Sequence, residues 1–83
     1  MKIHITESQL KYIRRYEQLK DCVKSDYEFL LNQGVPSNEA KEITIDHSSL
    51  TYLEDEDTDI EFTDENVFDL RDFIEDNFED LIS

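Results

Sequence analysis

The last stretch of the chain, residues 63–83, reads TDENVFDLRDFIEDNFEDLIS. Its apolar residues recur at steps of three and four, which is the spacing of one helix face. They are Val67, Leu70, Ile74, Phe78 and Leu81, and Phe73 and Ile82 reinforce the same face. Thr63 or Asp64 precedes this pattern and is a residue type that caps helix N-termini. We therefore predict a C-terminal amphipathic helix whose apolar face packs against the rest of the domain.

The opposite face of this helix is acidic. Along it, steps of four, three, four and three residues connect Glu65, Asp69, Asp72, Asp76 and Glu79, and Glu75 and Asp80 flank them. Like charges at this spacing destabilise a helix by roughly 0.2 to 0.5 kcal/mol per pair. Arg71 is the only cation in the segment. The pattern indicates that the acids serve a purpose outside the stability of the helix.

Charge is divided unequally along the chain. Residues 1–41 contain seven Lys or Arg and six Asp or Glu, whereas residues 42–83 contain one Arg and sixteen Asp or Glu. The two halves carry +1 and −15, which together give the net charge of −14. Such an excess opposes compact folding through self-repulsion. It also argues against binding to nucleic acid or to an anionic membrane surface, because both are negative. We expect the acidic half to face a basic partner.

The remaining sequence predicts an α+β fold in a single domain, residues 1–83. Residues 1–5 alternate as a short strand does, and Thr6 with Gln9 has the spacing of a capping box. From there to Asn32 no Gly or Pro interrupts the chain, which predicts one long helix or two shorter ones. The stripe of this helix comprises Leu10, Ile13, Tyr16, Leu19 or Lys20, Val23, Tyr27 and Leu30. Gly34 supplies a left-handed C-cap, and Pro36 follows it.

Short strands are expected between the two helical regions. Residues 42–47, EITIDH, alternate apolar and polar side chains as a half-buried strand does. A turn at 48–49 then leads to a second strand at 50–53, and residues 60–62 can form a third. The prediction is an antiparallel β-hairpin or a three-stranded sheet, followed by the acidic helix.

The acidic run 54–59 raises the question of calcium binding. Three alternating aspartates in it have the spacing that opens an EF-hand loop. The sixth position of that loop should be Gly and is Ile60, and the twelfth should be Glu and is Asn66. We interpret the run as an acidic, solvated turn, and we expect no metal ion and no cofactor.

Catalysis has little support in the sequence. His4 and His47 are the only histidines and Cys22 is the only thiol, so a nucleophile with its base, or a three-ligand zinc site, would need all of them to converge. A single cysteine excludes an internal disulfide and fits a reducing compartment. No apolar run is long enough for a signal peptide or a membrane span. We predict a cytoplasmic protein that is not an enzyme.

The acidity could also have a cause other than a basic partner. Adaptation to high salt would act on both halves and suppress lysine, yet residues 1–41 contain five lysines. Disorder is disfavoured by an apolar content of 37%. The acids could simply be the solvated face of a small domain. Alternatively, the segment is an interaction module of the transcription-regulator or antitoxin-like kind, in which the apolar face of the helix, including Phe68, Phe73 and Phe78, enters a groove of the partner.

In its size, charge and low content of Gly and Pro, the chain resembles the small acidic bacteriophage inhibitors that imitate DNA. These include anti-restriction proteins, anti-CRISPR proteins and the uracil-DNA glycosylase inhibitor. The opening residues 5–10, ITESQL, also resemble the start of small phage proteins. The resemblance implies a host-defence inhibitor in the bacterial cytoplasm. It would occlude the DNA- or RNA-binding surface of a nuclease, restriction enzyme, CRISPR effector or glycosylase, without turnover of its own.

The surface predicted to bind this partner is acidic throughout. It comprises Glu54, Asp55, Glu56, Asp57, Asp59, Glu61, Asp64, Glu65, Asp69, Asp72, Asp76, Glu79 and Asp80. A basic protein would meet these carboxylates through many moderate ion pairs, with association that weakens as salt rises. The lysines and arginines of the first helical region could also dock the acidic half of a second copy, which would give a homodimer.

Overall fold

The computed structural model describes residues 7–54 and 60–83, and these ranges contain helices and no strand. The elements are the 3₁₀ helix η1 (Glu7–Arg15) and the α-helices α1 (Tyr16–Asn32), α2 (Ser37–Glu54), α3 (Asp64–Asp76) and α4 (Phe78–Leu81). The α+β prediction is therefore wrong, and the described chain is all-helical. The strand predicted at residues 1–5 and the cap predicted at Thr6 lie outside the described residues.

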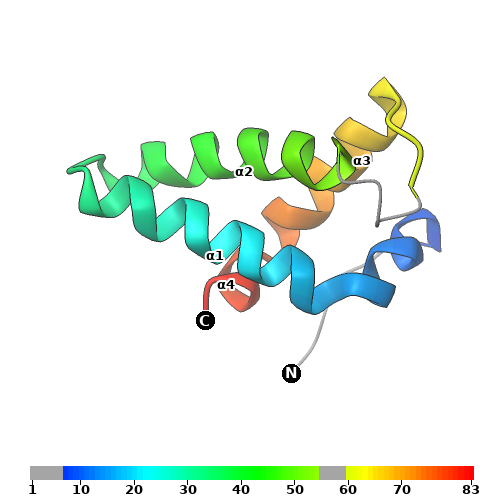
Figure 1. Cartoon of the computed structure of the whole chain (residues 1–83), viewed down its shortest axis with the longest axis horizontal. Coiled ribbons are helices and arrows are strands. Elements are labelled where there is room, and N and C mark those ends of the chain that lie inside the picture. Colours follow the sequence, from blue (N-terminus) through cyan, green and yellow to red (C-terminus); the bar gives the residue numbers. More distant parts are fainter. Residues whose placement is uncertain (1–6, 55–59) are drawn as a thin grey trace.

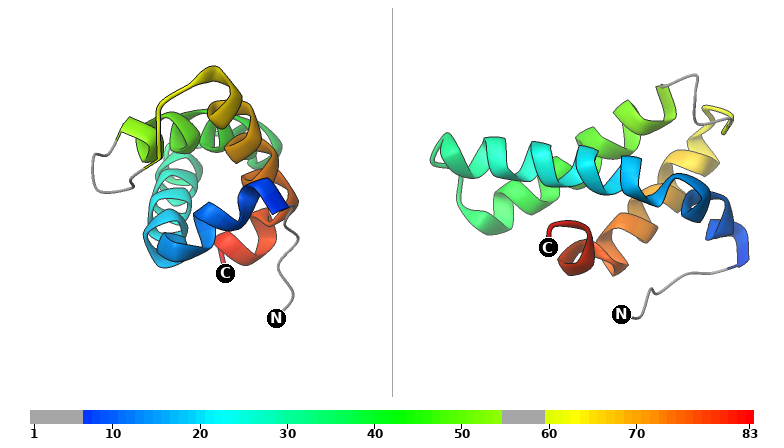
Figure 2. Two further views of the ribbon diagram at one scale, coloured as in Figure 1. Left: turned by 90° about the vertical axis from the view of Figure 1, so that its right-hand side faces the viewer. Right: turned by 60° about the horizontal axis from the view of Figure 1, so that its bottom comes forward.

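The helices α1 and α2 lie side by side and antiparallel (Figure 1). Gly34 ends α1 with a φ of 87°, as its left-handed cap role predicted, and the chain then turns into α2. The helix α3 contacts α2 and η1, and α4 contacts α1. Viewed along the α1–α2 pair, the helices surround one interior (Figure 2).

Residues 42–47 belong to α2 and not to a strand. The seven buried residues of α2 recur at steps of one, three and four, which is helical spacing: Ala40, Thr44, Ile45, Ser48, Ser49, Tyr52 and Leu53. The alternation of Ile43 with Ile45 was misleading, because Ile43 is exposed. The predicted turn at 48–49 lies inside this helix, and the predicted strand at 50–53 is its last turn. Three of the buried residues are Ser or Thr, and the hydroxyl of one of them, Ser48, donates a hydrogen bond to Asp26 of α1.

The first helical region is divided into two elements. In a 3₁₀ helix, residues i and i+3 lie above one another, so η1 buries Gln9 and Tyr12 together. Leu10 and Ile13, which were predicted to be in the core, are exposed instead. The predicted α-helical stripe holds only from the start of α1, where Leu19 and Val23 are fully buried and Tyr16 and Tyr27 pack against the same core.

The predicted C-terminal helix is present as α3 and α4. Thr63 caps α3, because its hydroxyl accepts a hydrogen bond of 3.1 Å from the backbone N–H of Asn66. The buried residue Asn77 separates the two helices, and its amide donates to the carbonyl of Phe73 at 2.9 Å. Residues 60–62, predicted as a third strand, have no regular secondary structure.

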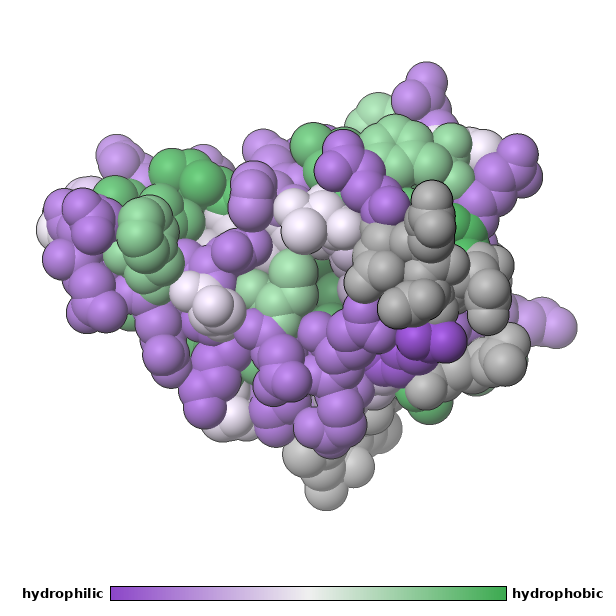
Figure 3. All heavy atoms as spheres, in the orientation of Figure 1, coloured by the Kyte–Doolittle hydropathy of each residue, from purple (hydrophilic) through white to green (hydrophobic). Residues whose placement is uncertain are grey.

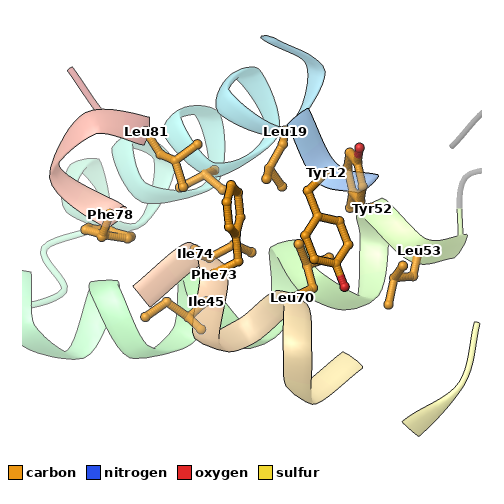
Figure 4. Close-up of a cluster of buried hydrophobic side chains, with 11 residues drawn as sticks. Tyr12, Leu19, Ile45, Tyr52, Leu53, Leu70, Phe73, Ile74, Phe78 and Leu81 are labelled. Carbon is orange, nitrogen blue, oxygen red and sulfur yellow. The ribbon is translucent and has the colours of Figure 1, made fainter. Parts of the chain in front are cut away.

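One hydrophobic core joins all five elements. Figure 4 shows Phe73 of α3 among side chains of the other helices, including Tyr12, Leu19 and Leu81. Phe73 is fully buried, and the centre of its ring lies 5.4 Å from the ring centre of Tyr12 and 6.2 Å from that of Tyr16. The apolar face predicted for residues 67–82 is thus the face that the core covers.

Candidate partner-binding surface

The residues of the predicted acidic surface fall into three groups. Asp55, Glu56, Asp57 and Asp59 lie outside the described residues. The exposed group consists of Glu54, Glu61, Asp64, Glu65, Asp72, Asp76 and Glu79. Asp69 and Asp80 are only half exposed. The acids of the exposed group are therefore more accessible to a partner than Asp69 and Asp80.

Four exposed carboxylates, Glu65, Asp72, Asp76 and Glu79, form what we call the acidic stripe of α3 and α4. Their outward orientation follows from the buried apolar residues on the opposite side of the same helices. Within the described ranges, ion pairs join His47 to Asp26 and Arg71 to Asp46. No residue of the acidic stripe pairs with a cation among the described residues, so its charge is uncompensated there.

Asp69 has a structural role that the sequence pattern did not reveal. The side-chain amide of Gln9 donates to the Asp69 carbonyl at 3.1 Å and to its carboxylate at 3.3 Å. The hydroxyl of Tyr12 donates to the other carboxylate oxygen at 3.4 Å and to the carbonyl of Asn66 at 3.3 Å. Asp69 thus fastens η1 to α3, and it is less available to a partner than the acidic stripe.

Asp80 has a similar role on α4, where it accepts a hydrogen bond from the hydroxyl of Tyr16. Burial, reinforced by this hydrogen bond, raises the pKa of Tyr16 well above its usual value. Burial and the charge of Asp69 raise the pKa of Tyr12 in the same way. Both tyrosines therefore stay neutral hydrogen-bond donors well into the alkaline range.

An open cleft of about 760 Å³ lies between α2 and α3, and the sequence did not predict it. It is lined by Asn38, Lys41, Glu42, Ile45, Asp46, Phe68, Arg71, Asp72 and Glu75. The cleft was missed because residues 42–47 were assigned to a strand, which would send neighbouring side chains to opposite faces. The one available signal was Arg71, the only cation after Lys41.

Of the residues considered for catalysis, His4 lies outside the described residues, and His47 and Cys22 have contacts within the fold. Asp26 of α1 accepts a hydrogen bond of 2.9 Å from the Ser48 hydroxyl and lies 2.9 Å from Nδ1 of His47, both in α2. Burial, followed by the charge of Asp26, raises the pKa of the Cys22 thiol. A reactive cysteine requires the opposite shift. Among the described residues, no group of three His, Cys, Asp or Glu side chains could hold a metal ion.

Hydrophilic side chains cover most of the face in Figure 3, and hydrophobic ones gather mainly toward its two ends. None of the helices in residues 7–54 and 60–83 is long and apolar enough to cross a membrane. Comparisons with protein-family models, with curated proteins and with solved structures find no match to this chain. Its function is accordingly inferred from its own geometry and charge.

Proposed function

We propose that this protein is an inhibitor that imitates DNA and binds the nucleic-acid-binding surface of a basic protein. The observation that supports this proposal is the acidic stripe: four exposed carboxylates without ion-pair partners among the described residues, held on helices whose other side is buried in the core. The partner would be a nuclease, restriction enzyme, CRISPR effector or glycosylase, and the inhibition would be stoichiometric.

The spacing of the acidic stripe supports a likeness to a phosphate row. An α-helix rises 1.5 Å per residue, so Asp72 and Asp76 are about 6 Å apart along the axis, and Glu65 and Asp72 are about 10.5 Å apart. Phosphates of one DNA strand recur about every 3.4 Å along the duplex axis. Along the axis, the carboxylates therefore recur at intervals of the same order as phosphate steps, as a row of negative charge.

The groove-binding alternative is less favoured. It requires the apolar face of the C-terminal segment to contact the partner, yet Phe73 is fully buried and Phe78 is nearly so. A helix presenting these residues would have to leave the core. The acidic stripe requires no such change, because its carboxylates are exposed in the folded protein.

The experiment is capture of partners from bacterial lysate on the tagged protein, followed by elution with duplex DNA and then with salt. We expect DNA to release a nucleic-acid-binding protein, because both would compete for one basic surface. The same capture is repeated with Glu65, Asp72, Asp76 and Glu79 changed to lysine, which should abolish it. This variant spares Asp69 and Asp80, whose carboxylates accept internal hydrogen bonds.

A matched control changes four exposed acids of the other half, Glu17, Asp21, Glu28 and Glu39, to lysine. Both variants alter the net charge equally, so a general electrostatic effect would weaken capture in both. The proposal requires loss only in the acidic-stripe variant. Capture that resists DNA elution, or equal loss in the two variants, would contradict it.

A further inference from the structure

The cleft between α2 and α3 contains a cation site that the chain fills with its own side chain. The guanidinium of Arg71 on α3 pairs with Asp46 on α2 at 2.7 Å and lies 6.0 Å from the ring centre of Phe68. A carboxylate of α2 and an aromatic ring of α3 thus flank one guanidinium. Such a pairing of a planar cation with a ring and an acid is a favourable way to recognise arginine.

The charges around the cleft favour a further cation. Its lining includes four carboxylates, those of Glu42, Asp46, Asp72 and Glu75, against the two cations Lys41 and Arg71. Lys41 is itself directed to an aromatic ring, because its ammonium lies 5.3 Å from the ring centre of Phe78. The cleft is therefore net negative, which disfavours a phosphate or any other anionic ligand. Ile45, which is buried, adds an apolar surface for the methylene groups of a long side chain.

The internal occupant is weakly held. The side chains of Arg71 and Asp46 remain 42% and 59% exposed, and ion pairs at this exposure contribute only about 0 to 1 kcal/mol. The ring of Phe68 is 62% exposed, so the aromatic surface is also open to solvent. An incoming guanidinium could therefore take the place of Arg71 at little cost.

We propose that this cleft receives an arginine side chain of the basic partner, which displaces Arg71 from Asp46 and Phe68. The inference rests on the proposed function for the nature of the partner, and it adds a specific anchor to the acidic stripe. Asp72 belongs to both the stripe and the cleft lining, so the two surfaces are continuous. Arginine should be preferred over lysine, because a planar guanidinium stacks on a ring and an ammonium does not.

The test measures binding of an oligoarginine peptide, and of an oligolysine peptide of equal length, to the full chain. Phe68→Ala should weaken the binding of oligoarginine by roughly two- to five-fold, as expected for the loss of one exposed cation–π contact. Phe29→Ala is the matched control, because Phe29 on α1 is also 62% exposed and does not line the cleft. It should leave the affinity unchanged.

A second pair of variants tests displacement. Arg71→Ala should strengthen oligoarginine binding by up to about five-fold, because it frees Asp46 and Phe68. Arg15→Ala on η1 removes the same charge from an exposed site outside the cleft and should have a smaller effect. All four side chains lie at the surface or are only partly buried, so circular dichroism should show an unchanged fold.

Equal affinities for Phe68→Ala and Phe29→Ala, equal gains for Arg71→Ala and Arg15→Ala, or no preference for arginine would each overturn the cleft proposal. Absence of any peptide binding would overturn it as well. The proposed function fails separately, through the DNA-elution experiment. Peptide binding that ignores the cleft variants but is lost in the acidic-stripe variant would refute the arginine site and leave the DNA-mimic proposal standing.

Discussion

Replacing Phe73 with alanine is expected to remove a large share of the stability of this protein. Phe73 is fully buried at the centre of the core, and its ring contacts those of Tyr12 and Tyr16. Truncation of a buried phenylalanine costs about 3 to 5 kcal/mol. Because two ring contacts are also lost, the cost of Phe73→Ala should lie toward the upper part of that range. A domain of 83 residues is stable by roughly 4 to 12 kcal/mol in total, so the variant should lose about a third or more of its stability.

Phe68→Ala is the matched control, since it makes the same substitution on the same helix at a side chain that is 62% exposed. Its cost should stay below about 1 kcal/mol, the value of an exposed contact with Arg71. Urea unfolding, followed by far-UV circular dichroism, measures the free energy of unfolding of both variants. If the two variants differ by less than about 1 kcal/mol in free energy of unfolding, then α3 does not pack through Phe73. The groove-binding alternative would then regain support.

Three further predictions concern single contacts. Tyr16→Phe should reduce the loss of stability above about pH 10, as urea midpoints of variant and wild type at neutral and alkaline pH would show. The pKa of Tyr16 is raised in the folded state, so its stabilising contribution is complete below about pH 10, the pKa of the unfolded chain, and is lost as the pH rises toward the folded pKa. Gly34→Ala should cost about 1 kcal/mol and Gly34→Asn less in thermal unfolding, because φ is 87° and nothing lies within 4 Å of an added Cβ. Thr63→Ala should cost about 1 kcal/mol in urea unfolding and Thr63→Ser much less, because Ser can still accept from the Asn66 N–H.

The C-terminal region was predictable because its core residues are large and strongly apolar. Leu70, Phe73, Ile74, Phe78 and Leu81 reveal the helical period in the sequence, and all five are buried. The division at Asn77 was not predictable from this period, which continues through it. It depends on the tertiary burial of Asn77 and on its hydrogen bond to the Phe73 carbonyl.

The error in α2 has the opposite cause. Its buried face is built largely from Ala40, Thr44, Ser48 and Ser49, which carry little hydrophobic signal. Meanwhile the exposed residues Ile43 and Leu50 supply apolar side chains outside that face. The polarity pattern therefore favoured a strand, although the residues that α2 buries have helical spacing. The uninterrupted run without Gly or Pro from 37 to 54 was the stronger indication of a helix.

The acidic residues were found from the sequence, but their roles could not be separated there. Asp69 and Asp76 are seven residues apart and so lie on one side of α3, yet the first accepts hydrogen bonds from η1 and the second is exposed. What distinguishes them is the position of η1, which packs against α3 near Asp69. No local sequence pattern predicted that residues 7–15 form a 3₁₀ helix. Loss of Asp69 should therefore reduce stability before it affects any partner. Loss of Asp76 removes a carboxylate without an ion-pair partner among the described residues, and it should leave the fold as stable or more so, because it relieves like-charge repulsion along α3.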